Sequence, residues 1–415
     1  MPINGSIILP GDKSLSHRSL MIGALSNGMS VINNISTGED VESTRRCLIE
    51  CGIFSEKIKS KVEIHGGKFS EPNNILNCGN SGTTLRLLMG LLAGQGISAK
   101  FIGDKSLSAR PMNRVLVPLE EMGVSFNSND GYLPITMNVP EQLNAISYNM
   151  SIASAQVKSS IIFASLGAMG DTSIYEEIKT RDHTEIMLSN LGVDIKTNKK
   201  IKIKENKRSI KNFNMTIPGD PSSASFFAAL TAMIPNSNLT IKNILANPTR
   251  AGFFTILKKM GTDIKWENMR VECGELIGDV CINSQPLCGI DIDSEMVPSI
   301  IDEIPIISIL ATQADSPTNV SGASELRVKE SDRIKAICIN LSNMGCEIIE
   351  KKDGFIINPV KKLYSTSINS FNDHRIAMSF MIANNIIDGE NIIDNTNCIN
   401  ISFPEFEDIL KTIIK

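Results

Sequence analysis

Helical segments with apolar faces alternate with strand-like segments along the whole chain. A pattern of Leu, two residues, an apolar residue and Gly recurs five times, at residues 48–52, 119–123, 188–192, 257–261 and 341–345. Each copy predicts a helix that ends at a left-handed glycine and turns into a strand of alternating apolar positions. The glycines are 69 to 84 residues apart, and residues 406–414 predict a sixth helix that stops before its glycine. The alternative interpretation is a common helix stop without any structural repeat.

A longer similarity relates the two halves of the chain. Residues 9–14 and 217–222 both place an apolar residue and Pro-Gly-Asp before a Ser-rich apolar run. The runs 14–25 and 222–233 predict helices that begin with an Asp or Ser cap. Together with the shorter repeat, this spacing predicts two homologous halves, each built of three α/β units.

Bulk composition favours a reduced, soluble protein of two domains. The chain has 415 residues, of which 42% are hydrophobic and 21% charged, with a net charge of −4. A length above about 200 residues favours two domains, and the charge gives no general attraction to nucleic acid or to anionic membranes. The nine cysteines include no CxxC pair, which favours their use as small apolar residues. The chain begins without a signal-peptide pattern and lacks a run of about 20 apolar residues, so we expect a cytoplasmic location.

The segment 196–211 is the most basic part of the chain, with eight Lys or Arg residues. One interpretation is an arm that binds nucleic acid. However, residues 200–204 alternate Lys and Ile without interleaved aromatic residues. This alternation predicts a half-buried strand whose outward lysines protect a sheet edge, and we favour that interpretation.

Basic residues also recur at predicted turns and helix starts. Arg is preferred where planar carboxylate or phosphate groups are recognised, so their distribution over both halves indicates a polyanionic ligand held between two domains. The alternative for each is ordinary surface charge. These residues are Lys13, Arg18, Arg86, Arg110, Lys158, Arg181, Arg327, Lys329, Arg333 and Arg375.

The turn 79–84 has the sequence Gly-Asn-Ser-Gly-Thr-Thr and precedes an apolar helix at 85–92. Backbone N–H groups at such a helix start can bind an anion where glycines permit close approach. The turn matches neither a Walker A loop nor a GxGxxG fingerprint, so it gives no indication of nucleotide binding. A simple helix cap is the alternative.

Four segments together resemble the EPSP synthase family of enolpyruvyl transferases. They are Gly-Asp-Lys-Ser-Leu-Ser-His-Arg at 11–18, Gly-Asn-Ser-Gly-Thr at 79–83, Arg-Val-Lys-Glu-Ser-Asp-Arg at 327–333 and Asn-Asp-His-Arg at 372–375. The resemblance covers essentially the whole chain in the same order. It implies an α/β fold of two similar domains, each with three βαβαββ repeats arranged as an inside-out α/β barrel, and an active site in the inter-domain cleft. The expected domains are residues 13–217, and residues 1–12 plus 218–415.

The resemblance further implies transfer of the enolpyruvyl group of phosphoenolpyruvate to the 5-hydroxyl of shikimate 3-phosphate, in chorismate and aromatic amino acid biosynthesis. It implies no metal or cofactor, no partner other than these two substrates, and a monomer. The implied ligands of shikimate 3-phosphate are Lys13, Ser14, Arg18, Ser154, Ala155, Gln156, Arg181, Asp302 and Lys329. Those of phosphoenolpyruvate are Lys13, Asn80, Gly82, Arg110, Gln156, Arg333 and Arg375.

The catalytic residues implied in the same way are Asp302, Glu330, Lys329 and Lys13. Asp302 would accept the proton of the 5-hydroxyl, and Glu330 would protonate the methylene carbon of phosphoenolpyruvate. A carboxylate among cations favours its ionised form, so Glu330 can serve as an acid only if burial or the bound trianion offsets them. Simple ion pairing with Arg333 is the alternative for both acids. His374 is expected to be a neighbour of the site.

Two positions depart from the family pattern. Glu325 stands where some members have an Asn that contacts the shikimate phosphate, and Ile401 where some have a Lys that binds phosphoenolpyruvate. The alternating apolar residues at 398–404 predict an ordinary strand that leads into the last helix. Gly82 is the small residue that leaves room for glyphosate in the family, where an alanine is linked with insensitivity.

Two other functions are open to a chain of this kind. UDP-N-acetylglucosamine enolpyruvyl transferases share the fold and chemistry, but they use a Cys on a mobile loop, where this chain has Arg110 in Ser-Ala-Arg-Pro. A binding protein for phosphorylated metabolites would leave Asp302 and Glu330 idle. Phosphate release from phosphoenolpyruvate that requires shikimate 3-phosphate distinguishes the three.

Overall fold

The computed structural model describes residues 1–198, 200–205 and 210–414. They form two compact units. Unit 2 contains Gly11–Ile217 and Glu272–Glu275, and unit 1 contains Met1–Pro10, Pro218–Val271 and Leu276–Lys415. The chain therefore starts in unit 1, builds unit 2, and returns to unit 1 at residue 218.

Unit 2 contains three copies of one βαβαββ arrangement. In its second and third copies the first two strands of the sheet are parallel and the last two add antiparallel, in the orders β5-β6-β8-β7 and β10-β12-β14-β13. The second copy consists of β5 (Leu76–Asn77), α3 (Gly82–Gly94), β6 (Ala99–Ile102), α4 (Lys105–Ser108), α5 (Asn113–Glu121), β7 (Ser125–Asn129) and β8 (Tyr132–Asn138). The third copy consists of β10 (Ser147–Asn149), α6 (Ala155–Ser165), β12 (Thr172–Tyr175), α7 (His183–Asn190), β13 (Ile195–Thr197) and β14 (Ile201–Ile203), beside the strand pair β9 (Leu143–Asn144) and β11 (Ala168–Met169).

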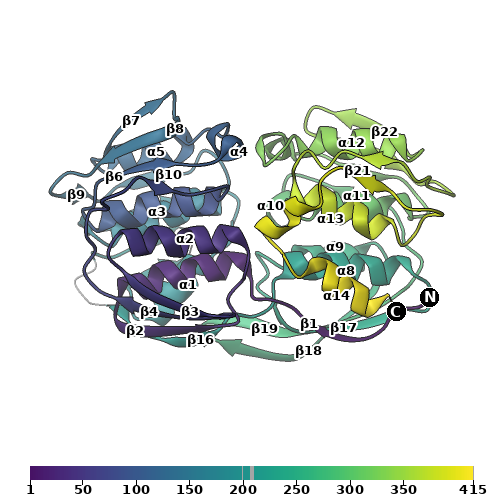
Figure 1. Ribbon diagram of the computed structural model, residues 1–415, viewed down its shortest axis with the longest axis horizontal. Coiled ribbons are helices and arrows are strands. Elements are labelled where there is room, and N and C mark those ends of the chain that lie inside the picture. Colours follow the sequence, from purple (N-terminus) through teal and green to yellow (C-terminus); the bar gives the residue numbers. More distant parts are fainter. Residues whose placement is uncertain (199, 206–209, 415) are drawn as a thin grey trace. The chain divides into compact units, whose positions relative to one another are not determined.

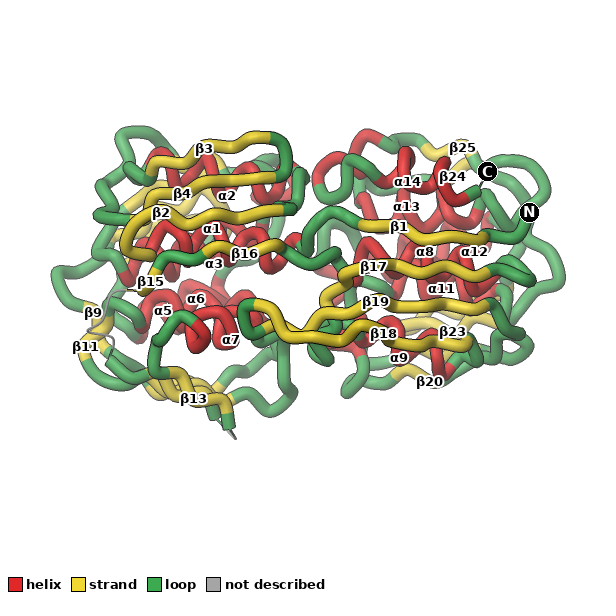
Figure 2. Tube along the Cα trace, turned by 90° about the horizontal axis from the view of Figure 1, so that it is seen from below, coloured by secondary structure: helices red, strands yellow, loops and turns green. Residues whose placement is uncertain are grey.

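The first copy of unit 2 closes with strands from the end of the unit. Strands β15 (Ile210–Lys211) and β16 (Asn214–Thr216) both pair in parallel with β2 (Ser26–Asn33). The remaining elements are α1 (Lys13–Leu25), α2 (Glu39–Glu50), β3 (Phe54–Ile58) and β4 (Lys61–Gly66). Figure 2 shows β3, β4, β2 and β16 side by side as one sheet, with α1 and α2 behind it.

Unit 1 repeats the same arrangement, and its first copy borrows the N-terminal strand. Strand β1 (Asn4–Ile8) pairs in parallel with β17 (Asn238–Leu245), and the sheet order is β1-β17-β19-β18. The other elements of this copy are α8 (Pro221–Met233), α9 (Gly252–Lys259), β18 (Asp263–Glu272) and β19 (Glu275–Asn283). The turn between β18 and β19 is counted in unit 2, where Glu275 contacts His183.

The last two copies of unit 1 differ in completeness. The second consists of β20 (Asp291–Ile292), α10 (Val297–Ile300), α11 (Ile304–Thr312), β21 (Thr318–Val320), the 3-10 helix η1 (Ser324–Val328), α12 (Arg333–Asn343), β22 (Glu347–Lys351) and β23 (Gly354–Asn358). The third has β24 (Ser367–Ile368), α13 (His374–Ala383), β25 (Ile392–Ile393), the 3-10 helix η2 (Asn397–Ile401) and α14 (Phe406–Ile413). These sheets confirm the α/β class and the repeats predicted from the sequence.

The first helix of each copy is buried on most of its faces and forms the centre of its unit. These helices are α1, α3 and α6 in unit 2, and α8, α11 and α13 in unit 1 (Figure 1). Close packing between α3 and α6 needs Gly90, because a Cβ there would lie 2.1 Å from the backbone oxygen of Ser160. The second helices, such as α2, bury only one face.

Helix boundaries follow the caps predicted from the sequence. Asp12 and Asp220 cap α1 and α8 by accepting backbone N–H groups at 2.7 Å. All five predicted terminal glycines have a positive φ, from +85° to +108°: Gly52, Gly123, Gly192, Gly261 and Gly345. Only glycine adopts this conformation without steric cost. The predicted sixth helix is α14.

Two local predictions are wrong. Residues 398–404 are not a strand: Cys398 and Ile399 are both buried, and the chain turns through η2, where the Ile399 N–H donates to Thr396 O at 3.0 Å. Strand β14 buries both of its isoleucines as predicted, but it is not a sheet edge, because the hairpin to β13 pairs its outer side. Residues 199 and 206–209 of the basic segment lie outside the described residues.

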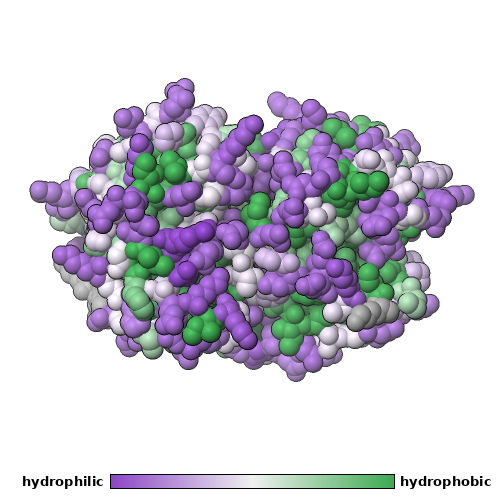
Figure 3. Space-filling view, viewed as in Figure 1, coloured by the Kyte–Doolittle hydropathy of each residue, from purple (hydrophilic) through white to green (hydrophobic). Residues whose placement is uncertain are grey.

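The face of the molecule drawn in Figure 3 is mainly polar. Figure 3 shows hydrophilic side chains over most of the visible face, with hydrophobic ones in small separate patches. All nine cysteines are unpaired by disulfides, as the sequence predicted. Among the helices of the described residues, none combines the length and the apolar character that crossing a bilayer requires.

Candidate functional site

The predicted site residues of unit 2 lie at the first turns of its central helices. Lys13 is the first residue of α1, with Ser14 next to it, and both are only partly buried. The Lys13 ammonium donates to Asp40 Oδ2 at 2.9 Å. This ion pair joins the start of α1 to the start of α2. It orients the Lys13 side chain, which remains 19% exposed.

Arg18 lies one turn further along α1 and is almost fully buried. Its Nε donates to Thr184 Oγ1 at 2.7 Å, its Nη2 to Ser159 Oγ at 2.9 Å and its Nη1 to the carbonyl of Ser14 at 3.0 Å. Burial is the main cause that lowers the pKa of Arg18 to about 10. The guanidinium is still protonated at neutral pH.

The glycine-rich turn brings Asn80, Gly82 and Arg110 together. Arg110 donates to Asn80 Oδ1 at 3.1 Å and to Ser106 Oγ at 3.0 Å, and Asn80 Nδ2 donates to Asp104 Oδ2 at 2.7 Å. Ser81 caps α3 by accepting the Thr84 N–H at 3.1 Å. Gly82 is the first residue of α3, so its N–H belongs to the unsatisfied donors of a helix start.

Residues Ser154, Ala155 and Gln156 form the corresponding start of α6. Ser154 is its cap, and Ala155 is its first residue. The side-chain amide of Gln156 is oriented by two bonds: its Oε1 accepts from Arg86 Nη1 at 2.7 Å, and its Nε2 donates to Thr83 Oγ1 at 2.9 Å. These bonds connect the starts of α6 and α3.

Arg181 precedes α7 and is half-buried. Burial lowers the pKa of Arg18 most, the charge of Glu185 raises it, and the positive charge of Arg181 lowers it further. The two arginines therefore act on each other electrostatically. An anion between them would relieve that repulsion.

The predicted catalytic residues of unit 1 converge on Arg333, the first residue of α12. Its Nη2 donates to Glu330 Oε2 at 2.6 Å, its Nη1 to Asp302 Oδ1 at 3.4 Å and its Nε to Asp373 Oδ2 at 2.7 Å. Burial would lower the pKa of Arg333, but the charges of Asp373, Glu330 and Asp302 outweigh it and raise that pKa above its ordinary value. The guanidinium is thus a permanent cation that holds both predicted acid–base groups.

Lys329 and Arg375 complete this cluster. Lys329 Nζ lies 3.5 Å from Asp302 Oδ1, on the side chain that Arg333 also contacts. Arg375, in the first turn of α13, donates to the Asp302 carbonyl at 3.2 Å and lies 3.5 Å from Glu303 Oε1. Glu303 also accepts from Ser222 and lies 3.4 Å from Arg250 Nη1.

Several residues of these clusters were missed in the sequence. Asp373 belongs to the Asn-Asp-His-Arg motif, and its place before a helix is an N-cap signal: it accepts the Arg375 N–H at 2.9 Å and holds Arg333. Glu303 could have been suspected only as the neighbour of Asp302. Thr184 and Asp40 give no signal in the sequence. His374 is buried at the start of α13, beside Asp373.

The two departures from the family pattern lie in the 3-10 helices of unit 1. Glu325 is half-buried in η1. Ile401 ends η2 and packs against the apolar core of unit 1, so its side chain serves packing.

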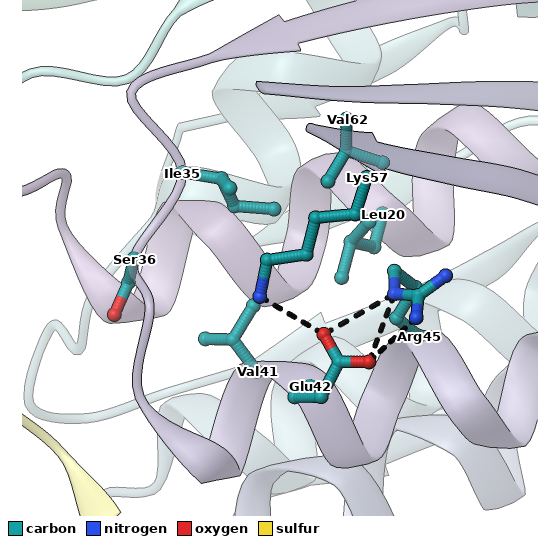
Figure 4. Close-up of a pocket in the computed structure, with 8 residues that line it drawn as sticks. All are labelled: Leu20, Ile35, Ser36, Val41, Glu42, Arg45, Lys57 and Val62. Atoms are coloured by element: carbon teal, nitrogen blue, oxygen red, sulfur yellow. Dashed lines mark hydrogen bonds and ion pairs between the residues drawn. The ribbon is translucent and has the colours of Figure 1, made fainter. Parts of the chain in front are cut away.

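A small pocket between α1, α2 and β4 lies away from these residues (Figure 4). Glu42 sits over it and pairs with Arg45 at 2.7 Å and with Lys57 at 3.0 Å. Burial opposes ionisation of Glu42, yet these two cations lower its pKa. None of the predicted site residues lines this pocket, and both of its cations already pair with Glu42.

Known proteins resemble the chain along its full length. A sequence model of EPSP synthase (3-phosphoshikimate 1-carboxyvinyltransferase) matches residues 1–410. A 3-phosphoshikimate 1-carboxyvinyltransferase of Petrotoga mobilis is 45% identical, over 99% of this chain and 97% of its own length, and one of Endomicrobium trichonymphae is 42% identical, over 100% and 98%. The solved EPSP synthase of Acinetobacter baumannii superposes with a TM-score of 0.88 at 39% identity, over 99% of this chain and 96% of that structure. The chain belongs to the EPSP synthase family.

Proposed function

We propose that this chain transfers the enolpyruvyl group of phosphoenolpyruvate to the 5-hydroxyl of shikimate 3-phosphate, releasing phosphate. The observation that carries the proposal is the Arg333 cluster of unit 1, where Asp302 and Glu330 lie within 3.4 and 2.6 Å of one guanidinium. Proton transfer in both directions needs two carboxylates, and developing negative charge needs a fixed cation. Membership of the family supports the same reaction.

The charge partners of the two units suggest a division of labour. Arg18 of unit 2 is held by neutral oxygens, whereas Arg333 and Arg375 of unit 1 each contact carboxylates. Unit 2 therefore supplies positive charge for anions, and unit 1 supplies groups that accept and donate protons. Unit 1 also supplies cations, because Arg333 and Arg375 lie in the same cluster as Asp302.

Shikimate 3-phosphate binds to unit 2 through its phosphate and ring hydroxyls. Its phosphate binds at the start of α1 and to Arg18, with Arg181 beside it. Hydrogen bonds to the surrounding protein orient Lys13 and Arg18, and the charge of Arg181 acts on Arg18. Its ring lies against the α6 start. The residues in this role are Lys13, Ser14, Arg18, Ser154, Ala155, Gln156 and Arg181.

Phosphoenolpyruvate binds to the remaining cations of the site. The Gly82 N–H and the Arg110–Asn80 pair bind its phosphate, and Gln156 and Lys13 contact both substrates. Arg333 and Arg375 bind its carboxylate from unit 1. No Lys is needed at Ile401 in this arrangement.

The chemical steps balance with two carboxylates. Glu330 gives its proton to the methylene carbon, the 5-hydroxyl oxygen bonds to the neighbouring carbon, and Asp302 takes the hydroxyl proton. The tetrahedral intermediate then returns a proton from the new methyl group to Glu330 as the carbon–oxygen bond to phosphate breaks. Asp302 gives up its proton to the departing phosphate or to solvent, which restores both carboxyl groups. Lys329, beside Asp302, stabilises the negative charge that develops on the 5-hydroxyl oxygen as its proton leaves. We also propose that the protein acts as a cytoplasmic monomer.

Phosphate release from phosphoenolpyruvate tests this function. We expect release only with shikimate 3-phosphate present, one phosphate for each enol ether formed, and no release with UDP-N-acetylglucosamine. Glu330→Gln and Asp302→Asn, which keep the shape of each side chain, should each lower kcat at least 100-fold. Near-normal turnover in Glu330→Gln would reject its role as the acid, and release without shikimate 3-phosphate would reject the reaction.

A further inference from the structure

The surroundings of Arg18 differ from those of Arg250 and Arg333, which are also buried. Arg250 and Arg333 each donate to carboxylates, at 2.6 and 2.7 Å. Arg18 instead directs Nε and Nη2, the edge that usually grips a carboxylate, at the hydroxyls of Thr184 and Ser159. Those two hydroxyls lie 2.7 Å from each other. Within the described residues, Arg18 has no carboxylate partner.

We propose that Thr184 and Ser159 are positioning residues for Arg18, which orient its guanidinium without neutralising it and so prepare it for the phosphate of the substrate. The inference rests on the proposed function, in which Arg18 binds that phosphate. It gives α7 and the second turn of α6 a role in orienting Arg18, which the sequence of neither helix indicates.

The hydrogen-bond inventory supports this role. A guanidinium has five N–H groups, and Thr184, Ser159 and the Ser14 carbonyl accept three of them. Two remain for a ligand. The hydroxyl pair has two hydrogens but needs only one for its mutual bond, so the other is available to a phosphate oxygen.

The negative charge of the ligand explains why hydroxyl groups rather than carboxylates contact Arg18. A carboxylate in place of Thr184 would fix the guanidinium equally well, but it would cancel the charge and repel a phosphate dianion. Two neutral acceptors leave a buried cation incompletely compensated, which is costly until an anion arrives. Glu185, the next residue, pairs with Lys158 at 2.9 Å rather than with Arg18. Its charge raises the pKa of Arg18, but burial outweighs it, so the guanidinium stays incompletely compensated.

Thr184→Val tests the proposal, since it keeps the shape and removes the acceptor. We expect the KM for shikimate 3-phosphate to rise about tenfold, as for loss of a hydrogen bond to a charged group. The KM for phosphoenolpyruvate and kcat should change less than about threefold. Thr184→Ser, which restores the hydroxyl, should return the KM to within about threefold of the parent value.

The matched control is Thr172→Val in β12. Thr172 is equally buried, and its hydroxyl has no hydrogen-bond partner in the described part of the chain. It should leave all three constants unchanged. Ser159→Ala removes the second hydroxyl and gives the same selective rise should valine at 184 prevent folding, which thermal unfolding will reveal.

Arg18→Lys distinguishes the inference from the function beneath it. Lysine lacks Nε, so Thr184→Val should add less than about twofold in that background if the threonine acts through Arg18. An unchanged KM for shikimate 3-phosphate in Arg18→Lys alone would reject the phosphate role of Arg18. If Arg18→Lys raises this KM, the positioning role alone is overturned by either of two results. One is that Thr184→Val has no effect in the parent enzyme, and the other is that it adds its full tenfold effect in the Arg18→Lys background.

Discussion

Gly82 lies beside two arginine side chains of unit 2. A Cβ built at Gly82 would lie 2.8 Å from Arg86 Nη1 and 3.5 Å from Arg110 Nη1. Arg86 also orients Gln156. One methyl group would therefore push a guanidinium and, through it, the amide that we assign to both substrates.

We expect Gly82→Ala to raise the KM for phosphoenolpyruvate about tenfold or more, with a smaller effect on kcat. The added methyl narrows the space over the α3 start and displaces Arg86, and a displacement of about 1 Å at a site can cost 100-fold. Steady-state kinetics with each substrate varied measures it. Gly67→Ala is the control, because a Cβ at Gly67 meets nothing within 4 Å. Equal KM values for Gly82→Ala and the parent would show that Arg86 moves aside at no cost.

The sequence could bring some site residues together and not others. Lys329 and Glu330 lie in the bend just before α12, which begins at Arg333, so the proximity of these three residues follows from the chain itself. Thr184 is 166 residues from Arg18, and a threonine in the first turn of a helix is unremarkable. Its role arises only when folding sets α7 against α1, so it could not be predicted from residue type or spacing.

Between elements, a series of buried hydrogen bonds joins α1, α2 and α3. His17 Nδ1 lies 2.7 Å from Thr44 Oγ1, which lies 2.7 Å from Thr84 Oγ1, and Thr84 donates to Ser81 Oγ at 2.7 Å. Ser81 caps the helix that Gly82 begins. Burial, with the charges of Lys13 and Arg18, lowers the pKa of His17 well below 6.5, so the series holds a neutral imidazole.

Acid should therefore weaken this connection. Below pH about 6.5 the unfolded chain binds a proton at His17 that the native state excludes, so stability falls as the pH drops from 6.5 toward the native pKa. The loss is at most about 1.4 kcal/mol per pH unit. Thermal unfolding from pH 7.5 to 5 should show a shallower acid loss for His17→Gln than for the parent. His65→Gln, at an exposed position, should keep the parent slope; equal slopes in all three would contradict the assignment.

Elements were predictable where the sequence carries a period or a cap. The helices that end at Gly52, Gly123, Gly192, Gly261 and Gly345 were predicted because a left-handed residue favours glycine. The prediction of a strand at 398–404 was wrong because alternating apolar residues are also compatible with a 3-10 helix that buries adjacent residues. Strands of two residues, such as β5 and β20, are too short to give a periodic signal.

At the scale of the whole molecule, the function that we propose uses cations of both units to bind two anionic substrates. Conformations in which both units share the ligands are then favoured, since a ligand shifts a population by its differential affinity. We expect the radius of gyration from X-ray scattering to fall when both substrates bind. Inorganic phosphate at matched ionic strength is the control, and an unchanged radius with both substrates would count against closure.

The duplication into halves was visible in the sequence because Pro-Gly-Asp recurs before both first helices. The sequence did not indicate that residues 272–275 belong to unit 2. Their position depends on a hairpin long enough to reach α7, where a Cβ at Gly274 would lie 2.9 Å from Ile186. Neither length nor composition of β18 and β19 indicates where their turn ends.

The pairing of β1 with β17 also has a consequence for synthesis on the ribosome. Ile3 donates its N–H to Ser237, 234 residues later. Strand β1 is therefore synthesised long before β17, the strand with which it pairs. At about 5–20 residues per second that interval is roughly 10–50 s, during which the other half can fold. A tag or truncation at the N-terminus should therefore harm the half that is translated last.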